Sequence, residues 1–337
     1  MPPKSWAAVT YEAPPNIALV KYWGVRDPTL ALPFNSSFSV TLADMRSRTT
    51  VRFDETLGAD SVILNGKVAT GGPRDAVVRF LERVRAKAEI DARADVRSEN
   101  NFPTATGLAS SASGFAALAG ASSRAAGLAL SDRELSQLAR FGSGSACRSV
   151  FGGFVEWKAG RRSDGADCFA EPVFGPDHWP ELVDLVVLVR GAPVKEVRSA
   201  DAMQTSVRSS PYYEQRQKEI PPRLRRIRAA IGARKAETLF PLIIEECDSF
   251  RQVCETSRPS LDYLTSTSRA ILEEVRSANR TAGTPIAGYT HDAGAHVHVF
   301  ALKQHLKGLQ RNLGLVDGVE SMMVVRPGPG GHAVDSN

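Results

Sequence analysis

The segment that most constrains this chain spans residues 101–115 and reads NFPTATGLASSASGF. It combines Pro103, Gly107 and Gly114 with several hydroxyl side chains, and an alanine-rich apolar stretch follows directly. Small residues let a backbone approach a phosphate closely, and the free N–H groups of a first helical turn point toward such an anion. The segment therefore predicts a phosphate-binding helix start, although a Ser-rich loop that caps a buried helix has similar residues.

The length of 337 residues allows two domains, and 42% hydrophobic with 23% charged residues is ordinary for a globular protein. The net charge of +5 favours anionic partners, but no Lys/Arg block resembles a nucleic-acid arm. The densest basic run, RLRRIR at 223–228, is interpreted as a solvated helix face. We find no apolar window long enough for a membrane span and no signal-peptide pattern, so neither nucleic acid nor membrane is an expected partner.

The pattern of strands and helices indicates the α+β class, because it lacks regular βαβ alternation. Strands are expected at 6–10, 17–22, 37–42, 49–53, 151–157, 184–190, 285–290, 297–302 and 322–325, and helices at 75–88, after 107, from 131, and at 210–232, 236–256 and 258–279. We place an N-terminal domain at 1–182 and a C-terminal domain at 183–326, because long helices dominate after the buried strand at 184–190. The glycine-rich residues 327–337 are expected to be a flexible tail.

Three further segments look chemical rather than structural. Residues 16–27, NIALVKYWGVRD, gather an amide, a lysine, aromatic rings and an arginine around one glycine. Residues 141–153 place Arg148 after a turn of small residues, and arginine suits a two-pronged grip on a carboxylate or phosphate. In residues 290–298, Asp292 lies between a strand and a glycine turn, where an acid can act as a base. Alternatives stay open for the first two: a strand with basic ends, and an exposed arginine at a helix start.

Histidines and cysteines favour structural roles. The histidines of residues 290–298 match no familiar zinc spacing. The 4 cysteines lack C-x-x-C spacing, which favours a reduced, cytoplasmic compartment. The remaining inventory is a phosphate cradle, hydroxyls for Mg²⁺, cations for an anionic substrate and one acid, which suits phosphoryl transfer to an alcohol.

Several segments, in order along the chain, resemble the signatures of the mevalonate diphosphate decarboxylases of the GHMP kinase superfamily. They read NIALVKYWGVRD, NSSFSVTL, NFPTATGLASSASGF, GSGSACRSVFGG and HDAGA. The resemblance implies an N-terminal half like ribosomal protein S5 domain 2, a ferredoxin-like C-terminal half and an active site in the cleft between them. It also implies a reaction of the mevalonate/isoprenoid pathway, in which ATP phosphorylates the 3-hydroxyl of a 5-phosphorylated mevalonate. Phosphate and CO₂ then leave to give isopentenyl diphosphate. A homodimer is expected.

The resemblance also implies roles for individual residues. Asp292 matches the essential aspartate near the 3-hydroxyl, Lys21 the lysine beside it, and Arg148 the arginine that holds the substrate carboxylate. Substrate contacts are expected at Asn16, Tyr22, Ser143, Ser145, Arg148, Lys195 and Met203. ATP contacts are expected at Pro103, Gly107, Leu108, Ser110, Ser111 and Ser113, with Ser111 also toward Mg²⁺. The pairing of Lys21 with Asp292 is reasonable in itself, since a nearby cation lowers the pKa of an acid.

Three positions depart from the family pattern and leave the exact substrate open. Val25 replaces a second basic residue that helps grip the diphosphate, Ala200 replaces a frequent basic residue, and the usual DAGPN turn ends in His296. Losing one cation at a diphosphate costs about 1–3 kcal/mol, which Arg198 or His296 could compensate. The alternatives are therefore decarboxylases of mevalonate 5-phosphate or 3,5-bisphosphate, or a mevalonate 3-kinase.

Two alternatives belong to other classes. A GHMP kinase for a different alcohol is disfavoured because Lys21 and Arg148 accompany Asp292. A non-catalytic binding protein on the same fold is disfavoured because the acid and the phosphate segment are both intact.

Overall fold

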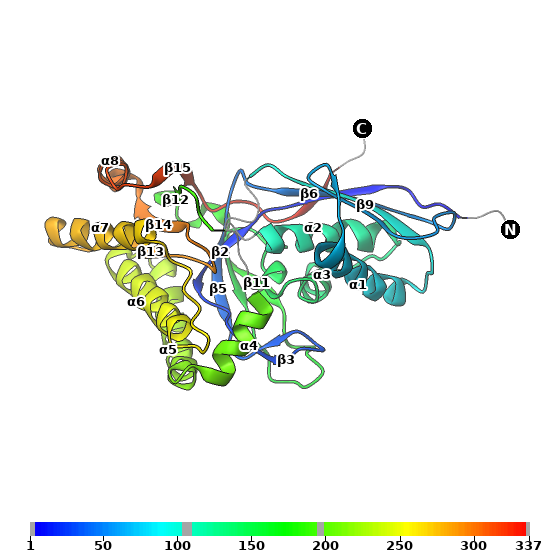
Figure 1. The fold of residues 1–337 in the computed structure, drawn as a ribbon, viewed down its shortest axis with the longest axis horizontal. Helices are drawn as coiled ribbons and strands as arrows, with labels where there is room; N and C mark the ends of the chain where they lie inside the picture. The colour runs from blue at the N-terminus through cyan, green and yellow to red at the C-terminus, as the bar shows by residue number, and fades with distance from the viewer. Residues whose placement is uncertain (1–3, 103–109, 194–198, 335–337) are drawn as a thin grey trace.

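The computed structural model describes residues 4–102, 110–193 and 199–334, and Figure 1 shows two halves that meet at a central group of strands. The N-terminal half contains β1 (Val9–Ala13), β2 (Asn16–Val20), β3 (Val25–Asp27), β4 (Leu32–Pro33), β5 (Ser37–Thr41), β6 (Ser47–Asp54), β7 (Ser61–Leu64), β8 (Lys67–Val68), α1 (Gly71–Ala88), β9 (Arg93–Asn100), α2 (Ser110–Ala125), α3 (Asp132–Ala139), β10 (Phe154–Trp157) and β11 (Ala170–Phe174). The C-terminal half contains β12 (Leu182–Val189), α4 (Ser199–Ser209), α5 (Tyr213–Gly232), α6 (Ala236–Glu255), α7 (Ser266–Ala282), β13 (Ala287–Thr290), β14 (Val297–Leu302), α8 (Leu306–Leu313) and β15 (Val319–Val325), and β16 (His332–Val334) follows it. The predicted α+β class is confirmed.

The first sheet carries helix α2 on its buried face. Within the described residues its strand order is β16-β1-β6-β9-β7-β8. Strand β6 alternates buried and exposed side chains over most of its length, because successive residues of a strand face opposite sides. Helix α2 lies so close to β1 that a Cβ atom added to Gly120 would meet the Tyr11 ring at 2.4 Å. The small residues after the phosphate segment therefore allow this helix to pack tightly on the sheet.

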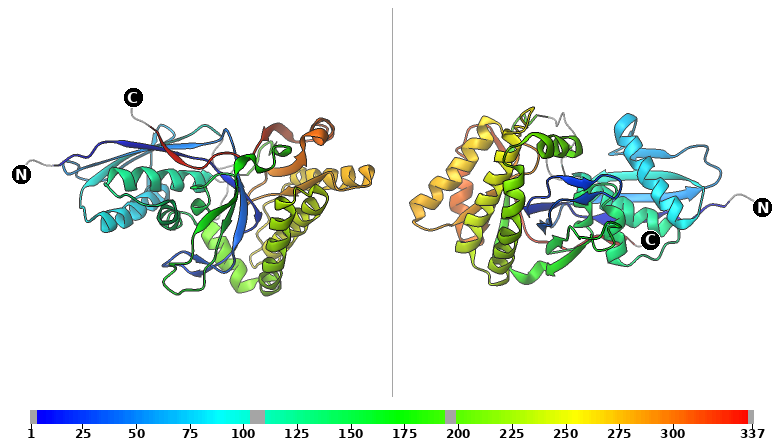
Figure 2. Two further views of the ribbon diagram at one scale, coloured as in Figure 1. Left: turned by 180° about the vertical axis from the view of Figure 1, so that it is seen from behind. Right: turned by 90° about the horizontal axis from the view of Figure 1, so that it is seen from below.

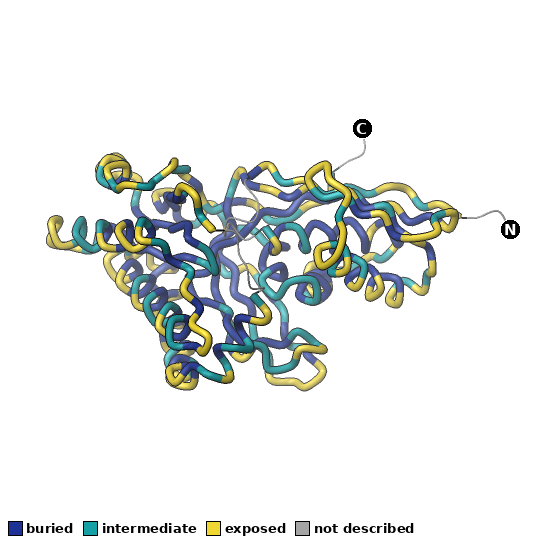
Figure 3. The backbone as a smooth tube through the Cα atoms, viewed as in Figure 1, coloured by how far each residue is buried: buried dark blue, intermediate teal, exposed yellow. Residues whose placement is uncertain are grey.

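Two smaller sheets bring the halves together. Their orders are β11-β10-β5-β2 and β13-β14-β12-β15 among the described strands. Ile17 and Phe38 of the former share an apolar cluster with Val186 of β12, Leu224 of α5 and Phe240 of α6. Figure 3 shows this buried region between the exposed outer surfaces of the two halves. The shared core fixes the end of β2 relative to the C-terminal half.

The prediction of a flexible tail at 327–337 is wrong for residues 327–334. Strand β16 pairs with β1 in the antiparallel sense, Thr10 opposite Val334, and Figure 2 shows this C-terminal segment returning to the N-terminal half. The preceding glycines pack backbone against backbone, since a Cβ on Gly152 would meet the Gly330 nitrogen at 2.6 Å. Glycine here permits a close approach rather than disorder.

Other element predictions differ from the structure in extent. Helix α7 begins at Ser266 rather than 258, after a capping box formed by Thr265 and Ser268. Helix α5 continues through Pro221 and Pro222, each of which lacks a backbone N–H to donate within the helix. Its buried residues Ile220, Arg223, Leu224 and Ile227 show that tertiary packing compensates for the missing backbone hydrogen bonds. Strands β3, β4, β7, β8, β9, β11 and β16 and helices α4 and α8 were not predicted from the sequence. No helix in the described ranges has both the length and the apolar character to cross a membrane.

Candidate active site

Lys21 and Asp292 form an ion pair between the two halves. Lys21 directly follows β2 and Asp292 lies just after β13, and the hydroxyl of Thr290 donates to the Ala18 carbonyl at 3.4 Å between these strands. Lys21 Nζ lies 2.7 Å from Asp292 Oδ1, with side-chain exposures of 4% and 29%. The lysine is thus almost enclosed, while the acid keeps an accessible edge for a ligand. The predicted pairing of these residues is present in the structure.

Asp292 is held ionised by its surroundings. Burial acts to raise the pKa of this carboxyl, but the charge and hydrogen bond of Lys21 outweigh burial, with smaller effects from His298 and Arg148, so the pKa is lowered. His291 is buried, and burial lowers its pKa to about 4. It is therefore neutral at pH 7, and its Nδ1–H donates to the Asp292 carbonyl oxygen at 2.7 Å. That hydrogen bond fixes the backbone that carries the acid.

Replacing Lys21 with methionine should move the acid limb of the kcat–pH profile to higher pH. The change removes the main cause that lowers the Asp292 pKa and leaves burial, which raises it. The same depressed pKa contributes stability that is complete above the unfolded pKa of about 3.9 and is lost as pH falls through the folded value. Unfolding measured between about pH 2 and 5 should show a larger loss of stability toward low pH in the wild type than in Lys21→Met. An unshifted acid limb would remove Lys21 as the determinant.

Arg148 is a buried cation that has no carboxylate within 4.0 Å among the described residues. Its Nε donates to Asn16 Oδ1 at 3.0 Å and its Nη1 to Ser37 Oγ at 2.6 Å. Asn16 is itself oriented by donating to Ser149 Oγ at 2.8 Å and to the Ser145 carbonyl at 3.2 Å. Burial lowers the pKa of Arg148, which reflects the energetic penalty on an uncompensated charge. A buried guanidinium held only by neutral groups is suited to an anionic ligand.

Hydroxyl groups connect the start of α2 to the turn before Arg148. Ser111 Oγ lies 3.4 Å from Ser143 Oγ, which lies 3.3 Å from Ser145 Oγ. Gly144 between these serines packs under Tyr22, since an added Cβ would meet that ring at 2.7 Å. The predicted phosphate segment and the predicted substrate turn are therefore neighbours in space.

The described part of the phosphate segment fits a nucleotide phosphate. Ser110 and Ser111 open helix α2, no acidic residue lies in its first turn, and a Cβ on Gly114 would meet no described atom within 4 Å. The free N–H groups, the hydroxyls and the open space suit a phosphate with its Mg²⁺. Pro103, Gly107 and Leu108 lie outside the described residues. The prediction that the Ser113 side chain contacts ATP is wrong. This side chain is fully buried and its hydroxyl accepts from Ser47 Oγ at 2.7 Å, so it faces the sheet.

The three other residues predicted to contact the substrate are Tyr22, Met203 and Lys195, and they do not share one environment. Tyr22 packs edge-on against Trp157, with ring centroids 4.7 Å apart. Met203 belongs to a buried apolar cluster with Trp23 and Phe250, and no described polar contact links it to Lys21 or Arg148. Lys195 lies outside the described residues, as does Arg198.

His296 does not supply the cation that was considered for it. Its Nδ1 accepts the backbone N–H of Val189 at 3.1 Å, and burial lowers its pKa. The ring is therefore neutral at physiological pH and adds no positive charge at a diphosphate. The neighbouring His298 has a different partner, because its Nδ1 lies 2.6 Å from Asp184 Oδ2. Val25 is half-buried against the apolar cluster of Trp23, and Ala200 is exposed on α4.

Several neighbours of the site were not predicted. Ser37 and Asn35 lie in the segment NSSFSVTL, which resembles a family signature, but no role was expected for either residue. Ser37 contacts Arg148, and the Asn35 amide donates to the Lys21 carbonyl at 3.0 Å. Glu246 of α6 accepts the backbone N–H of Lys21 at 2.9 Å. Polar residues at the ends of buried runs were the available signal for all three.

The fold and the site define an enzyme of the GHMP kinase superfamily: a two-half α+β chain with a serine-rich helix start beside an acid, a lysine and a buried arginine. Residues 13–170 match the diphosphomevalonate decarboxylase-like N-terminal domain, and residues 185–320 match the mevalonate 5-diphosphate decarboxylase C-terminal domain. The chain belongs to the diphosphomevalonate decarboxylase family.

Individual relatives agree with this assignment. The diphosphomevalonate decarboxylases of Schizosaccharomyces pombe and Bos taurus are each 41% identical, over 88% and 89% of this chain and 79% and 78% of theirs. A structure of the mevalonate diphosphate decarboxylase from Enterococcus faecalis matches with a TM-score of 0.90 at 36% identity, covering 99% of this chain and 100% of that one. A structure of MDDEF in complex with MVAPP, AMPPCP and magnesium has a TM-score of 0.91 at 36% identity, with the same coverage.

Proposed function

We propose that this protein catalyses the ATP- and Mg²⁺-dependent decarboxylation of mevalonate 5-diphosphate to isopentenyl diphosphate. The observation that carries the proposal is the Lys21–Asp292 pair beside Arg148, a buried guanidinium whose hydrogen-bond partners among the described residues are neutral. This arrangement offers an ionised acid for a hydroxyl and a cation for a carboxylate of one small substrate. The relatives at 41% identity are diphosphomevalonate decarboxylases, which supports the same reaction here.

The residues of the site suit a phosphorylation followed by elimination. Arg148 would grip the substrate carboxylate, and Asp292 would accept a hydrogen bond from the tertiary 3-hydroxyl. ATP supplies the phosphoryl group and Mg²⁺ neutralises its phosphates. Because phosphoryl transfer has a loose transition state, the hydroxyl becomes acidic only as its bond to phosphorus forms, and even a carboxylate of low pKa can then accept the proton. Lys21 keeps that carboxylate charged and in position.

The second stage needs no additional base. The 3-phosphate is a far better leaving group than hydroxide, so the C3–O bond breaks as the C–C bond to the carboxylate breaks. The electron pair of that C–C bond forms the alkene, and CO₂ and phosphate are released. A carboxylate fixed by a buried arginine would keep the breaking bond aligned, which is the positioning that such a reaction requires.

Decarboxylation of mevalonate 5-phosphate is the second candidate. Val25 stands where the family has a basic residue and lies against an apolar cluster, and His296 is held neutral. Both observations remove positive charge that a second phosphate group could use. A smaller anion would fit this loss.

A side-by-side assay separates the candidates. Mevalonate, its 5-phosphate, its 3,5-bisphosphate and its 5-diphosphate would each be supplied with MgATP, and ATP consumption and CO₂ release would be followed separately. The proposal expects stoichiometric CO₂ with the highest kcat/KM for the 5-diphosphate. Phosphorylated product without CO₂ would indicate a kinase instead.

Exchanging Val25 for lysine should raise the preference for the diphosphate over the monophosphate by about tenfold, because one added charge-assisted contact is worth about 1–3 kcal/mol. The ratio of the two kcat/KM values measures the preference. Ala200→Lys, on the exposed start of α4, is the matched variant at the other departure. If Val25→Lys leaves the ratio unchanged, residue 25 does not contact the second phosphate.

The homodimer, the cytoplasmic location and the domain boundary at residue 182 are part of the proposal. The location is supported by Cys147, Cys168, Cys247 and Cys254, which are all free and buried, as a reduced compartment allows. Sedimentation equilibrium would test the dimer, and limited proteolysis the boundary.

A further inference from the structure

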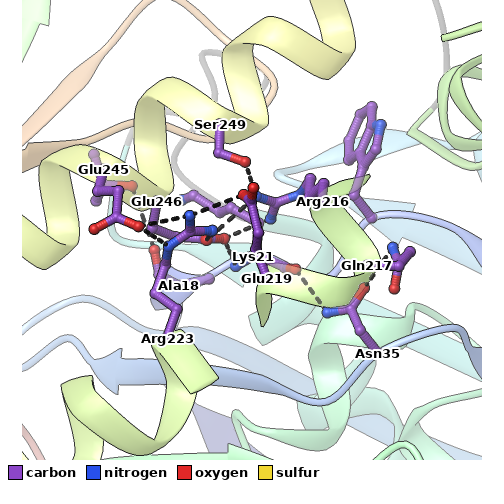
Figure 4. Close-up of polar contacts among 12 residues, drawn as sticks. Ala18, Lys21, Asn35, Arg216, Gln217, Glu219, Arg223, Glu245, Glu246 and Ser249 are labelled. Carbon is purple, nitrogen blue, oxygen red and sulfur yellow. Dashed lines mark hydrogen bonds and ion pairs between the residues drawn. The ribbon is translucent and has the colours of Figure 1, made fainter. Parts of the chain in front are cut away.

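Lys21 has its two backbone polar groups held by side chains rather than by a neighbouring strand. The N–H donates to Glu246 Oε1 at 2.9 Å, and the carbonyl accepts from Asn35 Nδ2 at 3.0 Å. Figure 4 shows Lys21 between Glu246 on helix α6 and Asn35. The backbone of Lys21, the residue that follows strand β2, is thus held at both its N–H and its carbonyl group.

Glu246 is an unusual group to use for this purpose, because it is 0% exposed. Its carboxylate accepts from Arg216 through both oxygens and from Arg223 Nη1 at 2.9 Å, and both arginines come from α5. Arg223 also pairs with Glu245 and Glu219, so it is not the solvated residue expected of the run at 223–228. The two arginines compensate the charge of the buried Glu246 carboxylate and give it several donors, as a buried ion requires.

We propose that Glu246 and Asn35 are positioning residues that fix the backbone of Lys21, so that its ammonium group reaches Asp292. The inference rests on the proposed function, in which the Lys21–Asp292 pair acts. A cluster that served only to join α5 to α6 would not need to accept a hydrogen bond from a residue of the other half, 225 positions away in sequence. A contact directly at the catalytic lysine indicates alignment of that lysine.

The first test removes the acceptor of the Lys21 N–H by exchanging Glu246 and Arg216 together for methionine. This takes out one buried charge of each sign and leaves Arg223 with Glu219 and Glu245, and such apolar replacements of buried pairs are often neutral for stability. The Lys21 N–H then has no acceptor from α6. We expect kcat to fall about 10- to 100-fold through misplacement of the lysine, with little change in KM. The acid limb of kcat should move to higher pH, in the same direction as for Lys21→Met.

Two further variants separate positioning from general packing. Glu246→Gln combined with Arg216→Met has the same net charge as the double variant but keeps an amide oxygen for the Lys21 N–H, so it should retain most of kcat and the wild-type acid limb. Asn35→Ala removes the donor to the Lys21 carbonyl and should lower kcat and shift the limb like the double variant. Glu245→Gln is the matched control, because Glu245 contacts Arg223 and Arg226 but no described atom of Lys21; it should leave both measures unchanged.

The outcomes are distinct. A folded double variant, or an Asn35→Ala variant, with wild-type kcat and acid limb would overturn the inference, as would a Glu246→Gln/Arg216→Met variant as impaired as the double variant. If the double variant does not fold, Asn35→Ala and Glu246→Gln/Arg216→Met decide in the same way. Crystal structures give a readout that does not depend on activity: the Lys21–Asp292 pair should lengthen beyond about 4 Å in the double variant. A wild type without CO₂ release would refute the proposed function, whereas an active wild type with unaltered variants refutes only the positioning role.

Discussion

Asp292→Asn is expected to reduce kcat by about 10²- to 10⁴-fold while ATP binding stays nearly unchanged. The substitution preserves the shape of the side chain and leaves an oxygen for Lys21, which lies 2.7 Å from the carboxylate. It removes the negative charge that the lowered pKa maintains and that would receive the proton of the 3-hydroxyl. ATP should still bind, because its expected contacts lie at the start of α2 in the other half.

The measurement is single-turnover CO₂ release together with calorimetric binding of MgATP. Asp248→Asn is the matched control: this acid also lies on the C-terminal half and pairs with Arg276 and Tyr289, with no described contact to Lys21. It should retain normal kcat. Near-normal turnover of Asp292→Asn would refute the catalytic role of the acid.

Arg148→Met should lower kcat/KM by about 10²- to 10³-fold, since removal of one partner of a buried, hydrogen-bonded charge pair costs about 2–5 kcal/mol. The loss should appear in the binding of mevalonate 5-diphosphate and in the decarboxylation step alike. The effect on folding should be small in comparison. Methionine removes a charge that burial already penalises, and among the described residues it leaves Asn16 and Ser37 without that partner.

Calorimetric Kd values and thermal unfolding would separate these effects. Arg148→Lys keeps a cation but not the planar fork, and it should restore only part of the affinity. Arg140→Met is a control for loss of a buried arginine, because Arg140 donates to the Cys168 carbonyl and has no described hydrogen bond or ion pair with Lys21, Asp292 or Arg148. Normal substrate affinity in Arg148→Met would show that the carboxylate binds elsewhere.

The central residues of the site were predictable because each lies in a segment with its own chemical signature. Lys21 and Asp292 form the pair that the resemblance implied, and the hydroxyls of Ser111 and Ser143 lie near one another, while the roles of these residues and of Arg148 stay predictions. The sequence pattern gave a wrong prediction where packing turns a hydroxyl side chain toward the interior of the protein. Ser113 appears equivalent to Ser111 in the sequence, yet it lies on the sheet side of α2 and bonds to Ser47.

Long-range pairings were beyond the sequence signals used. Glu246 follows Leu242 and Ile243 at helical spacing, which places an acid on the buried face of α6 and marks it as unusual. Nothing in that spacing indicates that its partners are Arg216 and the backbone of Lys21. Likewise, the glycines at 328 and 330 have the composition of a flexible segment, but Gly328 allows the close approach of Ala43 and Gly330 that of residues 150–152.

The pairing of β16 with β1 has a consequence for how the chain is made. Because β16 follows the whole C-terminal half, the first sheet cannot be completed until that half has emerged from the ribosome. Until then, β1 presents an open edge of the kind that pairs with other chains. The N-terminal half is therefore synthesised first but completes its fold last. The C-terminal half can fold while the first sheet still lacks strand β16.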